Sequence, residues 1–480
     1  MDAAQPAHPT WSYPSRFFRR LAPFGACGGG AARAAEALRR PVSLRDLAAP
    51  VTKRSLLAGA AARALLLGLA ATSLGCASKR EASLEFWGLG REGEVVASLV
   101  PEFERRYPGV RVKVQQIPWT SAHEKLVTAF VGKAPPDLAQ LGNTWLPEFA
   151  AIGALEKLDA SLASSHSLSM EDYFSGVWQT NLYEGALYGI PWYVDTRVLF
   201  YRPDLLARAG YSQAPRGWDS WQEAMRRVRA VQPPGAHPIL LPTNEWEQLV
   251  LFGVSKGSIL LDPRGTRGAF RQAPFAAAAQ FYVGLYREGL APIVAYTQLG
   301  NAYQEFARGN IAMWITGPWN LGEFRRRLSR QEQSLWMTAP LPAPDPAAWP
   351  GTSFAGGSSL AVFSGSRLKP DAWKLIEFLS EPEIQSRFYD LSGDLPARKA
   401  AWENAALASD AKARAFRIQL ERVAPMPRVP EWEQIAQKLA EDMEGAIRGR
   451  QSVADALAMV DADVDRILEK RRWMLSRRGR

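Results

Sequence analysis

Cysteine is almost absent from this chain, which has only Cys27 and Cys76 in 480 residues. Both precede the part of the sequence that is patterned like a folded domain. The sequence therefore predicts a folded region with no disulfide, no thiolate nucleophile and no cysteine metal site. The four histidines, at positions 8, 123, 166 and 237, lack short metal-type spacing. We therefore predict no metal site and find little support for histidine-based catalysis.

Nucleotide-binding signals are also missing. The chain has no Gly-x-x-x-x-Gly-Lys-Ser/Thr loop. The segment Gly88-Leu-Gly-Arg-Glu-Gly93 has the Gly-x-Gly-x-x-Gly form, but the strand predicted next, Val110 to Gln116, ends in glutamine. A dinucleotide site needs an acidic residue there. We expect no cofactor, and we interpret the glycine loop as a strand-to-helix loop that faces a ligand.

Excess charge is concentrated near the ends of the chain. The formal net charge is +10, but residues 1–76 hold ten Lys/Arg against three Asp/Glu, which leaves 48 against 45 for the remainder. A basic tail at residues 470–480 accounts for much of what is left, so we predict no nucleic-acid partner. A chain that is 47% hydrophobic and 22% charged has the composition of a globular protein. At 480 residues it is longer than a single hydrophobic core usually serves. Two lobes are therefore expected.

The first 76 residues are patterned as an extension followed by a signal peptide. Residues 1–50 show no sustained apolar period and are predicted to be disordered or untranslated. A basic segment, Val51 to Arg54, precedes the uncharged run Ala64 to Gly75, which at twelve residues is too short to span a bilayer. A targeting presequence or disordered arm is the alternative. The run ends at Ser73-Leu-Gly-Cys76, which resembles a bacterial lipobox and implies lipidation of Cys76; ordinary cleavage nearby is the other possibility.

The rest of the chain is organised around Tyr188 to Tyr201. Gly189 and Pro191 break the preceding segment, and the β-branched and aromatic residues that follow predict a strand. Residues 202–210 then predict a helix, with proline in its first turn and glycine at its end. The strand carries a single carboxylate, Asp195, and is predicted to cross between the two lobes.

This stretch resembles the interlobe crossing of family 1 extracellular solute-binding proteins, the maltose-binding-protein-like receptors of carbohydrate ABC importers. Other motifs agree in order over roughly residues 81–470: Leu84-Glu-Phe-Trp-Gly88, Gly109-Val-Arg-Val-Lys-Val-Gln115, Pro136-Asp-Leu138, Gly309-Asn-Ile-Ala-Met-Trp-Ile-Thr-Gly-Pro-Trp-Asn320, Phe354-Ala-Gly-Gly-Ser-Ser-Leu360 and Leu395-Pro-Ala-Arg398. The resemblance implies an α/β, two-lobe, type II periplasmic-binding-protein fold. Each lobe would be a mixed sheet flanked by helices, and several strands would form the hinge.

On this resemblance, residues 81–190 and 358–393 are expected to form the first lobe, and residues 191–357 and 394–475 the second. The implied partners are a carbohydrate, two permease subunits and a separate ATPase. The protein is expected to be a monomeric lipoprotein in the periplasm or another extracytoplasmic space, touching the membrane only through its N-terminal lipid. No enzymatic activity is implied.

Candidate ligand contacts in the first lobe follow the predicted strands. Gln116 continues the inward phase of Val110, Val112 and Val114, and open α/β sheets bind ligands at the carboxyl ends of their strands. Ser121-x-x-Glu124 predicts the start of the next helix. The candidates here are Trp87, Glu92, Gln116, Trp119, Asn143, Thr144 and Trp145; a strand-end polar residue and core tryptophans are the alternatives.

Residues 352–363 are predicted to form a second crossing between the lobes and residues 393–398 a third. Further candidates lie on these crossings and in the second lobe. Gly356 and Gly357 allow close backbone approach to a ligand, and Trp319 begins a helix whose free amides suit oxygen atoms. Core packing is the alternative for Trp246, and a surface salt bridge is the alternative for Arg398. The candidates here are Tyr193, Asp195, Trp246, Trp319, Gly356, Gly357, Ser358, Arg398 and Trp432.

Sixteen of the seventeen tryptophans follow Cys76, and about four are expected to reach the cleft. Indole faces pair with the C–H faces of pyranose rings, while carboxylates and amides satisfy hydroxyl groups, so the mixture favours a carbohydrate. Disaccharide, oligosaccharide and polyol-phosphate ligands all stay open. The alternative is a glycosidase or lyase, which needs two carboxylates about 5 to 9.5 Å apart, and Asp195 has no partner evident in the sequence.

Asp195 carries the sharpest expectation. As a ligand contact, its replacement by alanine is expected to weaken binding about 10- to 150-fold with little change in melting temperature. The alternative is a structural pair of Asp195 with Arg197 or Arg202, which would couple stability to affinity.

Overall fold

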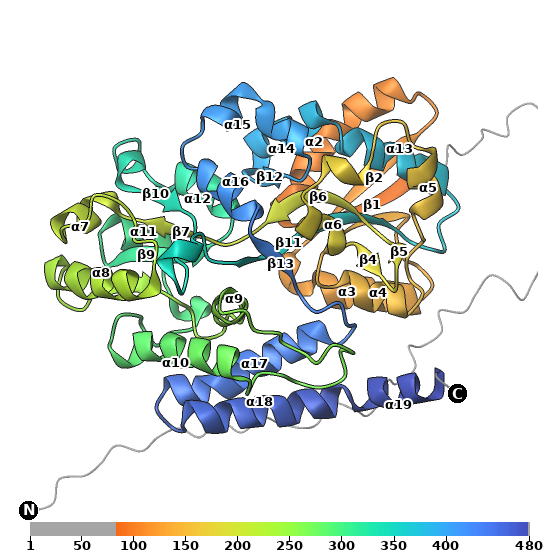
Figure 1. Cartoon of the computed structure of the whole chain (residues 1–480). Helices are drawn as coiled ribbons and strands as arrows, with labels where there is room; N and C mark the ends of the chain where they lie inside the picture. The colour runs from red at the N-terminus through yellow and green to blue at the C-terminus, as the bar shows by residue number, and fades with distance from the viewer. Residues whose placement is uncertain (1–82, 479–480) are drawn as a thin grey trace, which may run out of the picture. The chain divides into compact units, whose positions relative to one another are not determined.

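Two β-sheets organise residues 83–478, the part of the chain that this computed structural model describes (Figure 1). The predicted extension, signal peptide and lipidation site at Cys76 lie outside the described residues. Within residues 83–478, none of the helices combines the length and the apolar character that a bilayer crossing needs.

The larger sheet has seven strands in the order β12-β6-β11-β3-β1-β2, with β13 paired to β11. The strand β1 runs parallel to β2 and β3, and β11 runs antiparallel to β3 and β6, so the sheet is mixed. Its strands are β1 (Ser83–Leu89), β2 (Arg111–Ile117), β3 (Leu138–Gly142), β6 (Ile190–Asp195), β11 (Ser353–Val362), β12 (Leu395–Pro396) and β13 (Val423–Pro425).

Helices flank this sheet with their apolar sides toward it. Helix α2 buries Val96, Leu99 and Phe103, the three residues whose spacing marks one helix face. The flanking helices are α2 (Gly90–Arg106), α3 (Trp119–Val131), α13 (Lys369–Leu379) and α14 (Pro382–Ser392). Helix α3 begins at Trp119, with Pro118 at its N-cap and no side-chain cap, so the helix start predicted with Ser121 as N-cap is wrong by three residues.

The smaller sheet has four strands in the order β10-β7-β9-β8. Its strands are β7 (Val198–Tyr201), β8 (His237–Leu240), β9 (Ile311–Thr316) and β10 (Met337–Ala339). Trp221 on helix α8 (Trp218–Val231) is fully buried and donates its indole N–H to Met313 Sδ on β9 at 3.2 Å. This contact ties the helical layer to the sheet, as the helical spacing of Trp221, Met225 and Val228 predicts.

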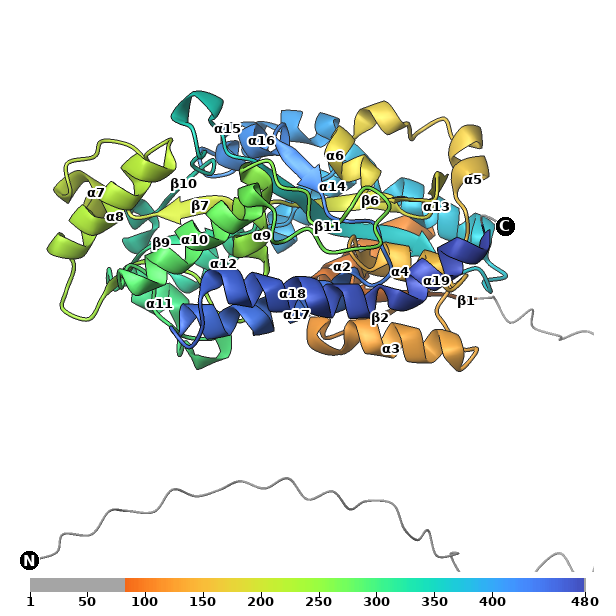
Figure 2. The ribbon, with the colours of Figure 1, turned by 60° about the horizontal axis from the view of Figure 1, so that its bottom comes forward.

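The helices of the smaller sheet come from two distant parts of the chain. Figure 2 shows α17 and α18 lying side by side, and their buried faces join one core with α9 and α10. These helices are α8 (Trp218–Val231), α9 (Glu247–Ser255), α10 (Ala273–Arg287), α17 (Trp432–Ile447) and α18 (Val453–Ile467). The remaining elements are α4 (Leu146–Ala151), α5 (Asp159–Ser164), α6 (Ser175–Gln179), β4 (Leu182–Tyr183), β5 (Ala186–Leu187), α7 (Pro203–Arg208), α11 (Ala302–Ala307), α12 (Trp319–Arg327), α15 (Ala405–Ser409), α16 (Arg414–Leu420) and α19 (Glu469–Arg478).

The three predicted crossings lie next to one another as β12, β6 and β11 of the larger sheet. The chain leaves β6 at Asp195 and enters β7 of the smaller sheet at Val198, so the central stretch does connect the two sheets. The predicted lobe boundaries at residues 190/191 and 357/358 fall inside β6 and β11, and 393/394 falls just before β12. These boundaries stay predictions.

Candidate ligand-binding site

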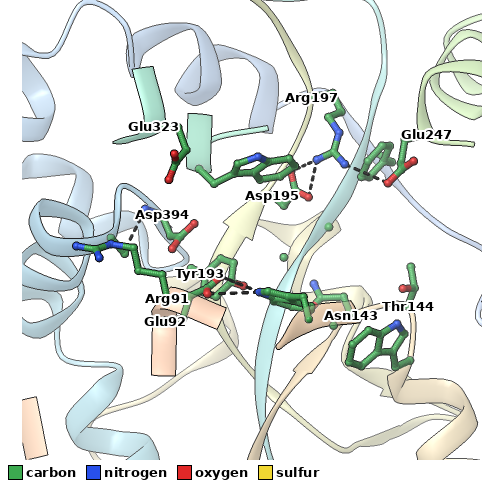
Figure 3. Close-up of a pocket in the computed structure, with 18 of the residues that line it drawn as sticks. Arg91, Glu92, Asn143, Thr144, Tyr193, Asp195, Arg197, Glu247, Glu323 and Asp394 are labelled. Carbon is green, nitrogen blue, oxygen red and sulfur yellow. Dashed lines mark hydrogen bonds and ion pairs between the residues drawn. The ribbon is translucent and has the colours of Figure 1, made fainter. Parts of the chain in front are cut away.

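A cavity of about 520 Å³ lies between the two sheets (Figure 3). The loops and helices after β1 and β3 line one side of it, the segments after β8 and β9 line the other, and β6 and β11 pass between. Ligands of open α/β sheets bind at the carboxyl ends of strands. The carboxyl ends of β1 and β3 in one sheet and of β8 and β9 in the other meet at this cavity. The cavity is therefore the candidate ligand-binding site.

Eleven of the sixteen predicted ligand contacts line this cavity. Four of the eleven are tryptophans, which matches the number expected to reach the cleft. The two aromatic groups lie on opposite sides: Trp119 packs edge-on against Trp145 at 5.6 Å between ring centroids, and Trp246 lies 5.9 Å from Phe354. The eleven are Glu92, Trp119, Asn143, Thr144, Trp145, Tyr193, Asp195, Trp246, Trp319, Gly356 and Gly357.

The structure places two predicted contacts in the hydrophobic core instead. Trp87 is buried in the cluster behind β1 and β3. Trp432 is 0% exposed and packs edge-on against Trp246 at 5.5 Å. Trp432 therefore lies behind a cavity tryptophan, where it supports Trp246 without facing the cavity.

Two further predicted contacts make internal polar interactions outside the cavity. Gln116 donates its side-chain N–H groups to the Gly90 carbonyl at 2.7 Å and to Glu94 at 3.1 Å. Arg398 pairs with Asp172 at 2.9 Å, but its side chain is only 12% exposed, so this salt bridge does not lie on the open surface as the alternative supposed. Neither side chain lines the cavity.

Ser358, the fifth, lies behind the cavity in a buried hydrogen-bond network centred on Tyr193. The Tyr193 hydroxyl donates to Glu92 at 3.0 Å and accepts from Gln140 at 3.0 Å and from Ser358 at 2.9 Å. The network joins α2, β3, β6 and β11, and burial raises the pKa of Tyr193 well above its usual value. It fixes the orientation of the Glu92 carboxyl.

The side-chain amide of Asn143 is likewise hydrogen-bonded to other residues of the protein. Its side-chain amide donates to Thr180 at 2.8 Å and accepts from Ser359 at 2.9 Å. Its backbone N–H donates to the Gly357 carbonyl at 3.1 Å. Asn143 therefore binds the crossing strand β11 to the end of β3, in addition to lining the cavity.

The backbone of Gly357 packs closely against the backbone of the neighbouring strand β6. Its φ of 129° lies in the region that favours glycine, and a Cβ atom there would lie 2.2 Å from the Tyr193 carbonyl oxygen. The close approach predicted from the glycine pair is therefore made by the neighbouring crossing strand β6.

Two acidic groups at one end of the cavity have no cation in an ion pair within the described chain. Glu92 is 8% exposed and accepts from the indole N–H of Trp119 at 3.3 Å, and Asp394 is 4% exposed. Burial raises the pKa of both carboxyls, and the negative charge of Glu92 raises the pKa of Asp394 further. Figure 3 shows both side chains directed into the cavity.

At the other end a buried arginine joins the crossing strand β6 to helix α9. Arg197 Nη1 lies 2.6 and 2.7 Å from the two carboxylate oxygens of Asp195, and Nη2 lies 3.2 Å from Glu247 on α9. Its guanidinium also lies 4.5 Å from the ring centroid of Trp319 and 5.1 Å from that of Phe354. The structural pair considered for Asp195 is therefore present, alongside its place in the cavity wall.

Ten residues that line the cavity were not among the predicted ligand contacts, although sequence patterns indicate some of them. Glu323 and Arg326 follow Trp319 at helical spacing, so the same helix face would have included them. Arg197 has the strand phase of Asp195. Glu433 reaches the cavity from α17, 289 positions after Thr144, and no local pattern indicates that the two residues share a site. The ten are Arg91, Gly142, Arg197, Glu247, Glu323, Arg326, Phe354, Ser392, Asp394 and Glu433.

Glu245, beside the cavity, gives a pH-dependent prediction. Burial, together with the charge of Glu247, raises the pKa of Glu245 to about 7. Because the folded-state pKa is above the unfolded one, ionisation costs stability as pH rises from about 4.5 to about 7. Glu245→Gln should therefore raise the free energy of unfolding by about 1 to 3 kcal/mol at pH 8 and leave it nearly unchanged at pH 4.5. Urea denaturation at both pH values measures this, and an equal effect at both would contradict it.

The fold and site together define a two-lobe ligand-binding protein of the type II periplasmic class. Among residues 83–478, no three His, Cys, Asp or Glu side chains are grouped so as to hold a metal ion. Residues 87–386 match the family model described as bacterial extracellular solute-binding protein. The chain belongs to this family.

Individual relatives agree with this assignment. The solved structure of the sugar-binding protein MalE from Xanthomonas citri is 47% identical, covers 82% of this chain and 99% of its own, and superposes with a TM-score of 0.78. The diacetylchitobiose-binding protein DasA of Streptomyces coelicolor is 25% identical over 78% of this chain and 86% of its own. The galactooligosaccharide-binding protein of Bacillus subtilis is 24% identical over 75% and 83%.

Proposed function

We propose that this protein is the substrate-binding receptor of a carbohydrate ABC importer and that the interlobe cavity holds the sugar. The observation that carries the proposal is the cavity wall. Four tryptophans and Phe354 offer apolar faces, and carboxyl, amide and hydroxyl groups alternate with them. Pyranose rings need this combination of apolar faces and hydrogen-bonding groups. The sugar-binding and oligosaccharide-binding relatives support the same ligand class.

The proposal includes closure of the two lobes around the ligand. The connections run through β6, β11 and β12, which lie side by side, and short adjacent connections suit a hinge. A sugar that touches both lobes stabilises the closed form by its differential affinity for that form. The closed protein then delivers the sugar to two permease subunits, with a separate ATPase supplying energy. We assign no catalytic step to the cavity.

A panel of saccharides tests the function. We expect at least one mono-, di- or oligosaccharide to raise the melting temperature and to bind 1:1 in calorimetry with a Kd on the order of micromolar, about −8 kcal/mol. The sugar should be recovered unchanged after incubation. Binding by no saccharide would contradict the receptor assignment, and cleavage of a bound sugar would favour the glycosidase or lyase alternative.

The proposal also includes an extracytoplasmic location with a lipid anchor at Cys76. A multiply acylated cysteine holds a protein stably at a membrane, whereas a single chain binds only marginally. Cys76→Ser is expected to move the protein from the membrane to the soluble fraction of lysed cells. A variant as membrane-bound as the wild type would remove the lipoprotein assignment.

A further inference from the structure

Helix α19 (Glu469–Arg478) is the last element of the described chain and has no part in the candidate site. Figures 1 and 2 show it following α18, and only Leu468 separates the two helices. None of its residues lines the cavity. Its sequence holds five Lys/Arg against a single acid and places Trp473, Met474 and Leu475 in a row. Capture of a sugar between the lobes gives this combination no role.

One side of α19 is packed against the protein. Arg472 donates to the Thr266 carbonyl at 2.8 Å and to the Asp465 carbonyl at 2.6 Å. Arg471 lies 3.7 Å from Glu431, and its side chain is 15% exposed. These contacts hold α19 against α18, against the loop at Thr266 and against the start of α17. The opposite side of the helix therefore faces solvent in a fixed orientation.

That opposite side carries an apolar pair between two cations. Lys470, Trp473, Met474 and Arg477 are spaced i, i+3, i+4 and i+7, so they share one helix face, and Leu475 lies outside it. Trp473 is 54% exposed and Met474 is 40% exposed. The Arg477 guanidinium lies 4.1 Å from the ring centroid of Trp473. Within residues 83–478, neither Lys470 nor Arg477 forms an ion pair. We call these four residues the α19 face.

The exposed tryptophan is the feature that a merely solvated helix end does not explain. In residues 83–478 the tryptophans that are more than a third exposed are Trp119, Trp319 and Trp473. The first two line the cavity, where a bound sugar would cover them. The helix dipole favours a cation such as Arg477 in the last turn. It gives no reason for Trp473 and Met474 to be exposed beside that cation.

The small size of the α19 face argues against a protein partner, including a second copy of this chain. A helix of ten residues is about 15 Å long and about 10 Å wide, so one face offers on the order of 150 Å². A stable protein–protein interface buries about 800 Å² on each partner.

A bilayer surface fits the face better. Tryptophan favours the headgroup region, where its ring is in an apolar layer and its N–H group is hydrated. Lysine and arginine lay their apolar stems along such a layer and extend their charges to lipid phosphates. Glu469, the single acid of α19, lies at the edge of the face one turn before Trp473, so the face keeps a net positive charge. The chemistry that complements it is an anionic lipid headgroup.

We propose that the α19 face binds the surface of a membrane that contains anionic lipids. Trp473 and Met474 enter the headgroup region, and Lys470 and Arg477 pair with lipid phosphates. Each cation near such a surface strengthens binding about fivefold, so the contact alone is weak. It orients a protein that is held at the membrane by another anchor. The proposal depends neither on lipidation of Cys76 nor on sugar binding, and it adds a membrane contact to the N-terminal one expected from the sequence.

Flotation of the full-length protein with vesicles tests the proposal. The vesicles are made of phosphatidylcholine alone or of phosphatidylcholine with phosphatidylglycerol. In the double variant Lys470→Glu/Arg477→Glu, we expect partition onto the anionic vesicles to fall at least about 10-fold and partition onto the neutral vesicles to stay unchanged. Trp473→Ser should lower partition onto the anionic vesicles about 3- to 10-fold. All these proteins share residues 1–469, so a difference between them reports on α19.

A matched control separates the α19 face from net charge. Lys157→Glu/Arg330→Glu makes the same change in net charge at two exposed positions outside α19, and it should retain most of the wild-type binding. The melting temperature of every variant should equal that of the wild type, because the altered side chains are exposed. Equal partition of the wild type, the α19 variant and the control overturns the proposal, as does a wild type that does not bind anionic vesicles. A wild-type dimer in sedimentation velocity that Trp473→Ser dissociates would assign the face to a second copy and would also overturn it.

Discussion

Arg197→Met is expected to lower the free energy of unfolding by about 3 to 5 kcal/mol at pH 8. The substitution keeps a long side chain beside Trp319 but leaves Asp195 and Glu247 without the cation that pairs with both. Carboxylates left without a cation in a buried site have a raised pKa, so the loss should grow as pH rises and be smaller at pH 5. Urea denaturation at the two pH values measures the difference.

An exposed ion pair provides the matched control. Arg226 pairs with Glu288 at 2.9 Å on the surface of the lobe that contains the smaller sheet, and Arg226→Met should cost no more than about 1 kcal/mol at either pH. If Arg197→Met behaves like this control, or costs the same at pH 5 and pH 8, then Arg197 is not the buried link between β6 and α9 that the structure describes.

The same pair changes what is expected of Asp195. From the sequence, Asp195→Ala should weaken ligand binding with little change in melting temperature. In the structure this substitution also deprives buried Arg197 of its closest carboxylate. We now expect affinity and stability to fall together, so Asp195→Ala cannot by itself assign Asp195 to the ligand.

Gly357→Ala is expected to destabilise the protein by about 2 to 4 kcal/mol. The backbone of an alanine residue is strained at φ = 129°, and the alanine Cβ would overlap the Tyr193 carbonyl oxygen on β6. The two crossing strands must then separate where they form the hinge. Thermal and urea denaturation measure the effect.

Gly365 supplies the control for this substitution. It lies just beyond β11, its φ is outside the left-handed region, and a Cβ there would have no atom within 4 Å. Gly365→Ala should change the free energy of unfolding by less than about 1 kcal/mol. Similar effects of the two substitutions would mean that β6 and β11 tolerate separation at Gly357.

The fold was predictable because its signals are local. Gly189 lies directly before β6, and β6 and β7 form in the apolar stretch that follows, although Pro191 lies inside β6 and does not end the segment before it. Trp221, Met225 and Val228 share one helix face and are buried together. The start of α3 was missed because Pro118 ends the preceding strand segment and fixes the helix start at Trp119 before the serine and glutamate signal is reached.

The site was less predictable because burial depends on tertiary contacts. Trp246 and Trp432 are equally plausible from sequence, but α17 packs Trp432 beneath Trp246 and only the latter lines the cavity. Asp394 and Glu92 are about 300 positions apart, and only the pairing of β12 with β6 beside α2 brings them to the same end of the cavity. No local pattern carries that information.

Binding between the two lobes is tested most directly by a crystal structure of the protein with a saccharide that binds in calorimetry. We expect the sugar in the cavity, touching Trp119 or Glu92 on the side of the larger sheet and Trp319 or Glu247 on the side of the smaller sheet. A sugar that contacts one lobe alone, or that lies outside the cavity, would contradict capture between the lobes.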